Sequence, residues 1–256
     1  MSIARTGLLV LVVMACAATE SAPASRQVAA DVRCELPEST VLRRDGNAVL
    51  EAWELPAAPV WFGETLPDAP GYLAYRAAIR VAGGDTIGPV ADPPQPNAAE
   101  REMWRREDLN AALMYGGGGQ VRPIRCLEAA LFARQDARYP DLTRPTEFIA
   151  HILRRNERLK VYLGASDQTF PPRAVYGLSA VAVDVAAGWQ HWVMLHNHTV
   201  RTLNGKPALG VPAPSTSDVQ LSSALRDQGL QEVWVTNGMY TGVVSTADLG
   251  RFSTRE

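Results

Sequence analysis

Residues 192–198 read Trp-Val-Met-Leu-His-Asn-His, a short apolar run that ends in two histidines. The length and apolar character of this run predict a buried strand. Side chains alternate between the two faces of a strand, so we expect His196 and His198 to share a face at its end. An isolated His-x-His pair is more often an accident of packing, but two imidazoles so placed also suit a metal ion.

A third ligand is offered by the polar segment 212–218, which reads Pro-Ala-Pro-Ser-Thr-Ser-Asp and leads into a predicted helix over residues 217–228. Asp218 lies in the first turn of that helix, where the helix dipole favours a carboxylate. A His-His-Asp set leaves one position of a tetrahedral zinc ion open, as catalytic sites require. The sequence therefore predicts a zinc site formed by His196, His198 and Asp218.

The rest of the C-terminal part alternates between strand-like and helix-like patterns. Apolar residues at helical spacing predict a helix over residues 124–138, and an Asn-Gly pair at 237–238 predicts a hairpin. Strands are predicted at residues 147–153, 159–163, 178–185, 233–236 and 239–244. This mixture indicates an α/β domain over residues 119–256, with a mixed sheet flanked by helices.

Residues 16–118 are predicted to form a tether and a small β-rich N-terminal extension. Within them, residues 31–90 read as short strands and turns, with a hairpin signal, Asp-Gly-Asn, at residues 45–47. Residues 116–119 are all glycine and lack the sequence of a phosphate-binding loop. They predict a flexible boundary before the domain over residues 119–256.

The composition is that of an ordinary globular protein. Of 256 residues, 46% are hydrophobic and 20% are charged, and the formal net charge is −2. No basic run is interleaved with aromatic residues. We therefore expect no nucleic acid among the partners of this chain.

The first fifteen residues read as a signal peptide. Arg5 supplies a positive charge before the apolar run at residues 7–13, which is shorter than the roughly 20 residues that a membrane-spanning helix needs. Val-Met-Ala-Cys at residues 13–16 resembles the bacterial lipobox. That resemblance implies that Cys16 is lipidated and becomes the N-terminus, as a membrane anchor. The alternative is an ordinary secretory signal that is cut one or two residues later.

The lipobox interpretation also predicts the cellular location of the protein and the state of its other two cysteines. Alanine at position 17 implies, by the same resemblance, the outer membrane on its periplasmic side. Cys34 and Cys126 then lie in an oxidising compartment, where two cysteines predict a disulfide. Two unpaired thiols are the alternative.

His-x-His followed by Ser-x-x-Asp resembles the signature of the JAMM (MPN+) zinc metallopeptidases and their bacterial RadC-type relatives. Here the two motifs stand at residues 196–198 and 215–218, and the flanking residues 210–215 look especially like the RadC pattern. The resemblance covers residues 120–256 and implies a cytidine deaminase-like fold. One departure is the segment 199–214, which is longer than the usual gap and is expected to form a polar surface loop over the cleft.

The resemblance also implies a role for each residue of the site. His196, His198 and Asp218 would hold Zn²⁺, and Ser215 would donate a hydrogen bond to the oxyanion. A glutamate at the start of the first strand would act as general base.

Two glutamates compete for the role of general base. Glu147 precedes the predicted strand that ends at residue 153, as the order of elements in the family requires. Glu128 is the alternative, but its neighbours fit a helix better. We therefore prefer Glu147.

The function expected from the sequence is zinc-dependent hydrolysis of a peptide or isopeptide bond, with a peptide or protein of the cell envelope as substrate. The alternative is an inactive MPN-like lipoprotein that acts as a binding module in the envelope. A resemblance of residues 195–199 to the opening motif of PHP-type phosphoesterases is rejected, because no histidine follows residue 198.

Overall fold

The computed structural model describes residues 33–63, 70–83, 109–203 and 206–252. These residues belong to one compact unit that spans Val32–Glu256. No helix in these ranges has both the length and the apolar character needed to cross a membrane. Cys16, the expected lipidation site, lies outside the described residues.

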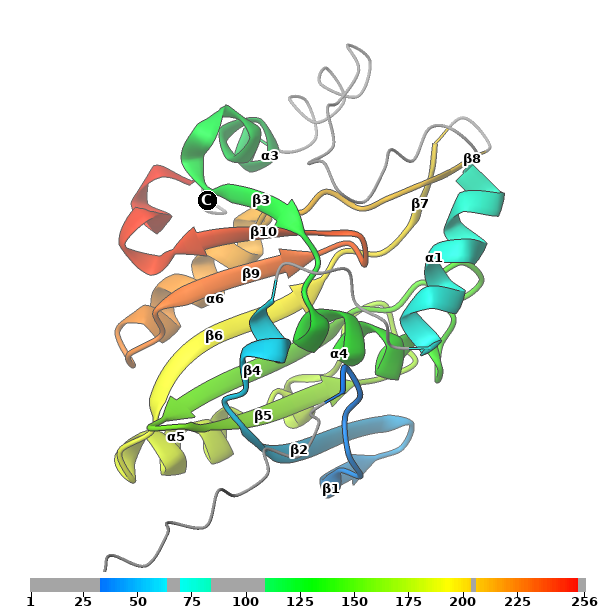
Figure 1. The fold of residues 1–256 in the computed structure, drawn as a ribbon. Helices are drawn as coiled ribbons and strands as arrows, with labels where there is room; N and C mark the ends of the chain where they lie inside the picture. Colours follow the sequence, from blue (N-terminus) through cyan, green and yellow to red (C-terminus); the bar gives the residue numbers. More distant parts are fainter. Residues whose placement is uncertain (1–32, 64–69, 84–108, 204–205, 253–256) are drawn as a thin grey trace, which may run out of the picture. The chain divides into compact units, whose positions relative to one another are not determined.

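A mixed eight-stranded sheet in the order β1-β2-β5-β4-β6-β9-β10-β3 forms the centre of the described chain (Figure 1). Its strands are β1 Thr40–Asp45, β2 Ala48–Pro56, β3 Gln120–Pro123, β4 Phe148–Arg155, β5 Arg158–Ala165, β6 Gln190–Asn197, β9 Glu232–Thr236 and β10 Tyr240–Ser245. Among these strands, only β6 and β9 are parallel neighbours. The α/β class predicted from the sequence is confirmed.

Helices cover both faces of the sheet. They are α1 Pro70–Gly83, α3 Leu109–Leu113, α4 Cys126–Asp136, α5 Leu178–Ala186 and α6 Thr216–Arg226. Short helical turns are η1 Pro59–Phe62, the π-helical η3 Met114–Gly118, η4 Arg173–Val175 and η5 Thr246–Arg251. Helix α4 packs into the apolar cluster on one face, whereas α5 and α6 pack into the clusters on the other.

Most of the predicted elements are confirmed, but the strand expected over residues 178–185 is wrong. This segment is helix α5, in which Val181 is buried and Val183 is 69% exposed. A short apolar run rich in valine does not distinguish a strand from a helix by its periodicity. Packing of one side of the segment against the sheet decides for the helix.

The expectation of only strands and turns over residues 31–90 is also wrong, because α1 lies within them. Tyr72, Tyr75 and Ile79 are each at most 3% exposed, and they lie at the spacing of one helical face. This face packs against α4. The hairpin predicted at residues 45–47 is confirmed by the pairing of β1 with β2.

The sheet runs across the boundary expected between residues 118 and 119. Strand β2, which precedes this boundary, pairs from Val49 to Pro56 with β5, which follows it. The four glycines belong to the compact turn η3 and its junction with β3. A side-chain carbon at Gly119 would lie 2.7 Å from the carbonyl oxygen of Val243, so close packing explains this glycine.

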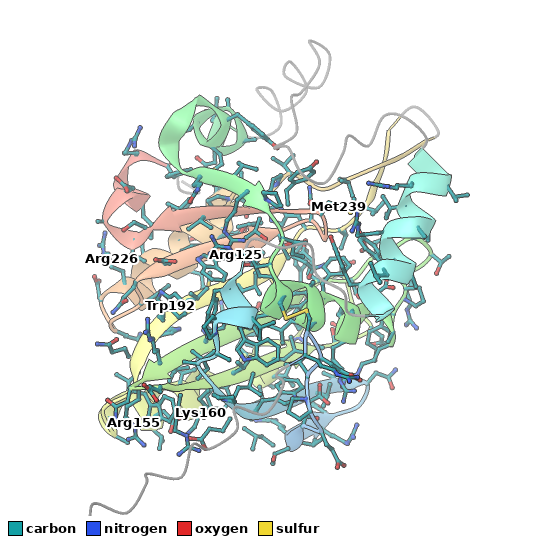
Figure 2. All side chains as sticks on the ribbon, in the orientation of Figure 1. Arg125, Arg155, Lys160, Trp192, Arg226 and Met239 are labelled. Carbon is teal, nitrogen blue, oxygen red and sulfur yellow. A yellow bond between two sulfur atoms is a disulfide. The ribbon has the colours of Figure 1, made fainter. Side chains whose placement is uncertain are left out.

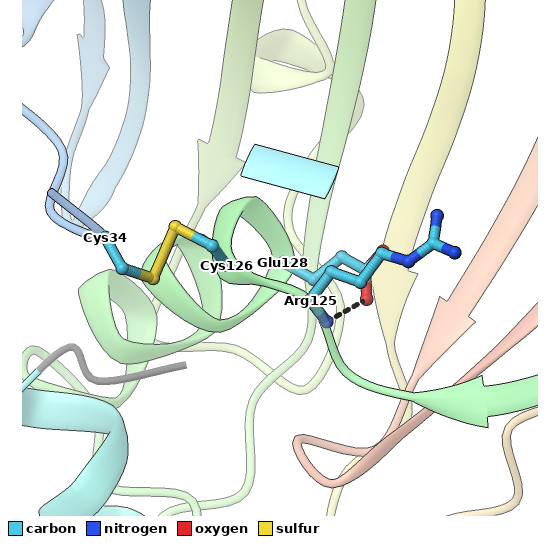
Figure 3. Close-up of a disulfide and its surroundings, with 4 residues drawn as sticks. All are labelled: Cys34, Arg125, Cys126 and Glu128. Carbon is cyan, nitrogen blue, oxygen red and sulfur yellow. Dashed lines mark hydrogen bonds between the residues drawn. A yellow bond between two sulfur atoms is a disulfide. The ribbon is translucent and has the colours of Figure 1, made fainter. Parts of the chain in front are cut away.

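The predicted disulfide joins Cys34 to Cys126 in the structure (Figure 3). It fastens the segment before β1 to the first residue of α4. Both cysteines are buried in the cluster between α4 and the sheet. The bridge therefore stabilises the α4 face of the molecule.

The segment 199–214 is more ordered than a surface loop. It contains a two-stranded ribbon of β7 Arg201–Leu203 and β8 Lys206–Ala208, and β8 contacts α1. After the ribbon, Val211 and Ala213 are buried. The second half of the segment is thus part of the core and lies against the candidate site.

Candidate metal centre

The candidate site lies where β6 and β9 end, at the first turn of the helix that connects them. Parallel strands joined through a helix bring their carboxyl ends to one edge, which is where ligands bind in α/β sheets. In Figure 2, the label of Trp192 marks the edge of the sheet where β6 begins, and the label of Met239 marks the opposite edge, just after the end of β9. The site lies at the edge marked by Met239.

Three polar side chains converge at this edge. The Nε2 atom of His196 lies 3.0 Å from Oδ2 of Asp218, and the Nε2 atom of His198 lies 3.4 Å from the same oxygen. The two Nε2 atoms are 3.3 Å apart. All three potential ligand atoms lie within 4.8 Å of one another. The structure thus brings together the three residues that the sequence predicted as ligands.

The orientation of His198 is fixed from behind. Its Nδ1 atom lies 2.7 Å from the carbonyl oxygen of Val211, which can only accept a hydrogen bond. Nδ1 therefore donates to this carbonyl, and Nε2 is the ring nitrogen that faces Asp218. The backbone N–H of His198 also donates to the carbonyl of Thr236. Such support for a histidine is typical of metal ligands.

Asp218 is held by the first turn of α6. Ser215 is the N-cap, and its backbone N–H and its hydroxyl donate to Oδ2 of Asp218 at 2.7 and 2.6 Å. Burial alone would raise the pKa of the Asp218 carboxyl, but the imidazoles of His196 and His198 hold that pKa well below its usual range. The carboxylate is therefore ionised, as a metal ligand must be.

The donor set fits zinc. Two imidazole nitrogens and one carboxylate oxygen are common zinc ligands, and three protein ligands leave a fourth position for water or substrate. His196 and His198 are 6% and 8% exposed, so the ligand atoms lie in a largely desolvated environment. In such surroundings a carboxylate oxygen and two imidazole nitrogens that lie close together favour a cation.

Glu147 lies beside the end of β6 that carries the two histidines. It immediately precedes β4, whose residue Ile149 is paired with His196. The Asn197 side chain bonds the main chain on both sides of Glu147, at Thr146 and Phe148, and so links this segment to the end of β6.

Tyr176, at the C-cap of η4, borders the same region. Burial raises the pKa of its hydroxyl, Arg173 opposes the rise, and the carboxylates of Asp218 and Glu147 add to it. The hydroxyl is therefore within electrostatic reach of both carboxylates. The sequence analysis gave Tyr176 no role, because nothing in its local pattern indicates where η4 packs.

Glu128 lies elsewhere. It is in α4, on the other face of the sheet, and is fully buried. Its carboxylate accepts hydrogen bonds from both terminal nitrogens of Arg122, from the hydroxyl of Thr241 and from the backbone N–H of Arg125 (Figure 3). A carboxylate with this set of partners serves a structural role on the α4 face.

The other two histidines, His151 and His191, are in direct contact and are 0% and 2% exposed, with Nδ1 of His151 3.0 Å from Nε2 of His191. They come from the neighbouring strands β4 and β6. Contacts between strands far apart in sequence cannot be read from either segment alone.

A comparison of the chain with protein-family models, with curated proteins and with solved structures gives no match.

Proposed function

We propose that this protein is a zinc-dependent hydrolase that cleaves a peptide or isopeptide bond in a peptide or protein of the cell envelope. The observation that carries the proposal is the convergence of His196, His198 and Asp218 at an edge of the sheet, with their ligand atoms within 4.8 Å. The resemblance of these residues and of Ser215 to the JAMM pattern supplies the class of reaction. A set of three protein ligands also favours a catalytic over a structural ion.

Zinc bound there would act as a Lewis acid and would lower the pKa of a coordinated water to about 7. Residues of the chain supply the remaining catalytic roles. Glu147 accepts a proton from the attacking water and passes it to the leaving amine. The position of Glu147 beside the end of β6 that carries the two histidines supports this role, whereas the buried hydrogen bonds of Glu128 leave that residue no such role.

Ser215 is proposed to stabilise the oxyanion of the tetrahedral intermediate. In the structure its hydroxyl donates to Asp218 at 2.6 Å and lies 2.9 Å from the hydroxyl of Ser217. The proposed role requires the hydroxyl to turn from Asp218 to the substrate carbonyl. A hydroxyl rotates freely enough for this, and the backbone N–H of Ser215 keeps its bond to Asp218.

We also propose that the chain is exported and anchored by a lipid on Cys16. The disulfide between Cys34 and Cys126 supports an oxidising compartment. Labelling of cells with radioactive palmitate tests the anchor. We expect the wild-type chain to carry label and the Cys16→Ser variant to carry none; an unlabelled wild-type chain contradicts the anchor without touching the zinc site.

The zinc proposal is tested by elemental analysis of the purified protein. We expect about one zinc ion per chain in the wild type and close to none in His196→Ala. His191→Asn is the matched control, because it changes a buried histidine of the same strand outside the site. Equal zinc in wild type and His196→Ala, or none in the wild type, would rule out the metal centre.

The hydrolase proposal is tested with the zinc-loaded protein on a panel of quenched fluorescent peptides and lysine-linked isopeptides. Glu147→Gln is expected to keep its zinc and to lose at least 100-fold in rate, since general acid–base catalysis contributes about 10²–10⁴-fold. A zinc-loaded wild type that cleaves nothing in the panel favours the binding module instead. A fully active Glu147→Gln variant contradicts the assignment of the general base.

A further inference from the structure

Asn197 stands between the two histidines of the site and is 1% exposed. Its side-chain oxygen accepts a hydrogen bond of 2.6 Å from the backbone N–H of Phe148. Its side-chain nitrogen donates a hydrogen bond of 3.1 Å to the backbone carbonyl of Thr146. Both polar ends of one buried carboxamide are therefore committed to the main chain of another segment.

The two main-chain groups that Asn197 holds lie on either side of Glu147. The pairing of β4 with β6 ends at Ile149 and His196. Beyond this pair, the side chain of Asn197 takes over the link between the two segments. The backbone N–H of Glu147 itself is bonded on its other side, to the carbonyl of Thr169 at 2.8 Å.

The backbone of Asn197 is anchored as well. Asn197 is paired with Thr236 of β9, and the backbone N–H of the next residue, His198, donates to the carbonyl oxygen of Thr236 at 2.8 Å. Asn197 thus joins three strands at the edge of the sheet where the site lies. A shift of its carboxamide would move the segment that carries Glu147 relative to both histidines.

We propose that Asn197 is a positioning residue, which fixes Glu147 at a set distance from the metal ligands by clamping the main chain on both sides of it. This inference rests on the proposed function, because it assigns Asn197 to the placement of the general base. A general base must lie within hydrogen-bond reach of the proton that it takes, so a small displacement of its backbone weakens catalysis.

The chemistry of the clamp requires an asparagine. The N–H of Phe148 needs an acceptor and the carbonyl of Thr146 needs a donor, and a carboxamide supplies both in one plane. Aspartate would keep the first bond but would set an acceptor against the carbonyl. Serine is shorter and offers one oxygen, and alanine offers neither group.

The test uses the full chain labelled with ¹³C at the side-chain carboxyl of glutamate, and zinc itself as the probe. The signal of Glu147 is identified as the one that is missing from Glu147→Gln. We expect zinc to shift this signal in the wild type, because the ion would lie close to the carboxylate. In Asn197→Ala the variant should still bind zinc, but the zinc-induced shift should fall to less than half.

Thr246→Val is the matched control. The hydroxyl of Thr246 donates a buried hydrogen bond to the carbonyl of Leu230, beyond the opposite end of β9. This control loses a buried hydrogen bond to the main chain, as Asn197→Ala does, but it should keep the full zinc-induced shift. A loss of shift in both variants would assign the effect to general destabilisation and would overturn the proposal.

The remaining outcomes separate this inference from the proposed function. If zinc leaves the Glu147 signal of the wild type unmoved, the proposed function fails, and the inference with it. If zinc moves the signal equally in wild type and Asn197→Ala, the inference alone fails.

Should Asn197→Ala not fold, Asn197→Ser takes its place. If neither folds, amide exchange decides: slow exchange at Phe148 in the wild type supports the clamp, and rapid exchange overturns it.

Discussion

The two histidine pairs of this molecule have nearly the same geometry and very different surroundings. In each pair the ring centroids are 5.0 Å apart, and the ring planes cross at 61° for His151 with His191 and 65° for His196 with His198. Both pairs are buried. What differs is the carboxylate: Asp218 lies against both rings of one pair, whereas no acidic side chain among the described residues bonds the other.

This difference separates a core contact from a candidate site. In the first pair one ring nitrogen donates to the other, and burial lowers the pKa of both rings, which favours their neutral forms. In the second pair both Nε2 atoms point at one carboxylate oxygen, and a backbone carbonyl holds Nδ1 of His198 from behind. Two imidazole nitrogens beside an ionised carboxylate form a donor set for a cation, which the pair of His151 and His191 lacks.

The largest expected effect comes from removing the charge that distinguishes the two pairs. Asp218→Asn should reduce the zinc content from about one ion per chain to near zero, while the amide still accepts the N-cap hydrogen bond of α6. Asp184→Asn is the control, because Asp184 is a buried carboxylate that bonds Tyr162 and Lys160 away from the site. Zinc retained by Asp218→Asn would show that the Asp218 carboxylate does not distinguish the two histidine pairs.

The two glutamates extend the comparison to carboxylates. Glu128→Gln should lower the free energy of unfolding by about 3–5 kcal/mol, because it leaves the buried guanidinium of Arg122 without its counter-charge. Glu147→Gln should change it by less than about 1 kcal/mol, since the side chain is only half-buried and keeps its size. Urea denaturation of the three proteins measures both values; a mild Glu128→Gln variant would contradict the structural role of that residue.

The buried pair of His151 and His191 should make the free energy of unfolding depend on pH. Burial lowers the pKa of His151 to about 3 and that of His191 to about 4. Unfolding restores values near 6.5, so the unfolded chain binds more protons below that pH. The stability that the pair contributes is complete above pH 6.5 and falls by about 1.4 kcal/mol per pH unit for each proton as the pH drops toward 4.

The measurement is urea denaturation between pH 4 and 7 for wild type and His191→Asn. Only the difference between the two is used, because burial raises the pKa of Asp141 to about 7 and makes its own contribution fall as the pH rises. The variant should have the shallower loss of stability on acidification. Parallel curves would show that His191 is not held neutral in the folded protein.

The smallest effect is expected at the helix cap that supports Asp218. Ser215→Ala should cost about 1 kcal/mol of stability, because it removes the side-chain cap of α6. It should also weaken zinc binding about tenfold, the lower range for a residue that supports a ligand. Ser217→Ala, at an exposed position of the same turn, is the control; equal zinc affinities in both variants would contradict the support assigned to Ser215.

Local patterns were sufficient for much of the fold. The apolar character of residues 147–153 and 192–198 predicted β4 and β6, and the Asn-Gly turn predicted the β9–β10 hairpin, because these signals arise from neighbouring residues. The strand predicted over residues 178–185 was wrong, since packing of one side of that segment against the sheet decided for α5. The N-terminal strands also joined the sheet by long-range pairing that no local signal reveals.

The sequence by itself determined the residues that can form the site, because two histidines at the end of a strand and an aspartate in a first helical turn are local features. Only the tertiary structure decided how they meet. It brought α6 back over β6, placed Val211 behind His198, and put Glu128 on the opposite face from Glu147. It also gave Asn197 its two bonds around Glu147. These relations join segments that are 13 to 113 residues apart, and only packing of the whole sheet sets them.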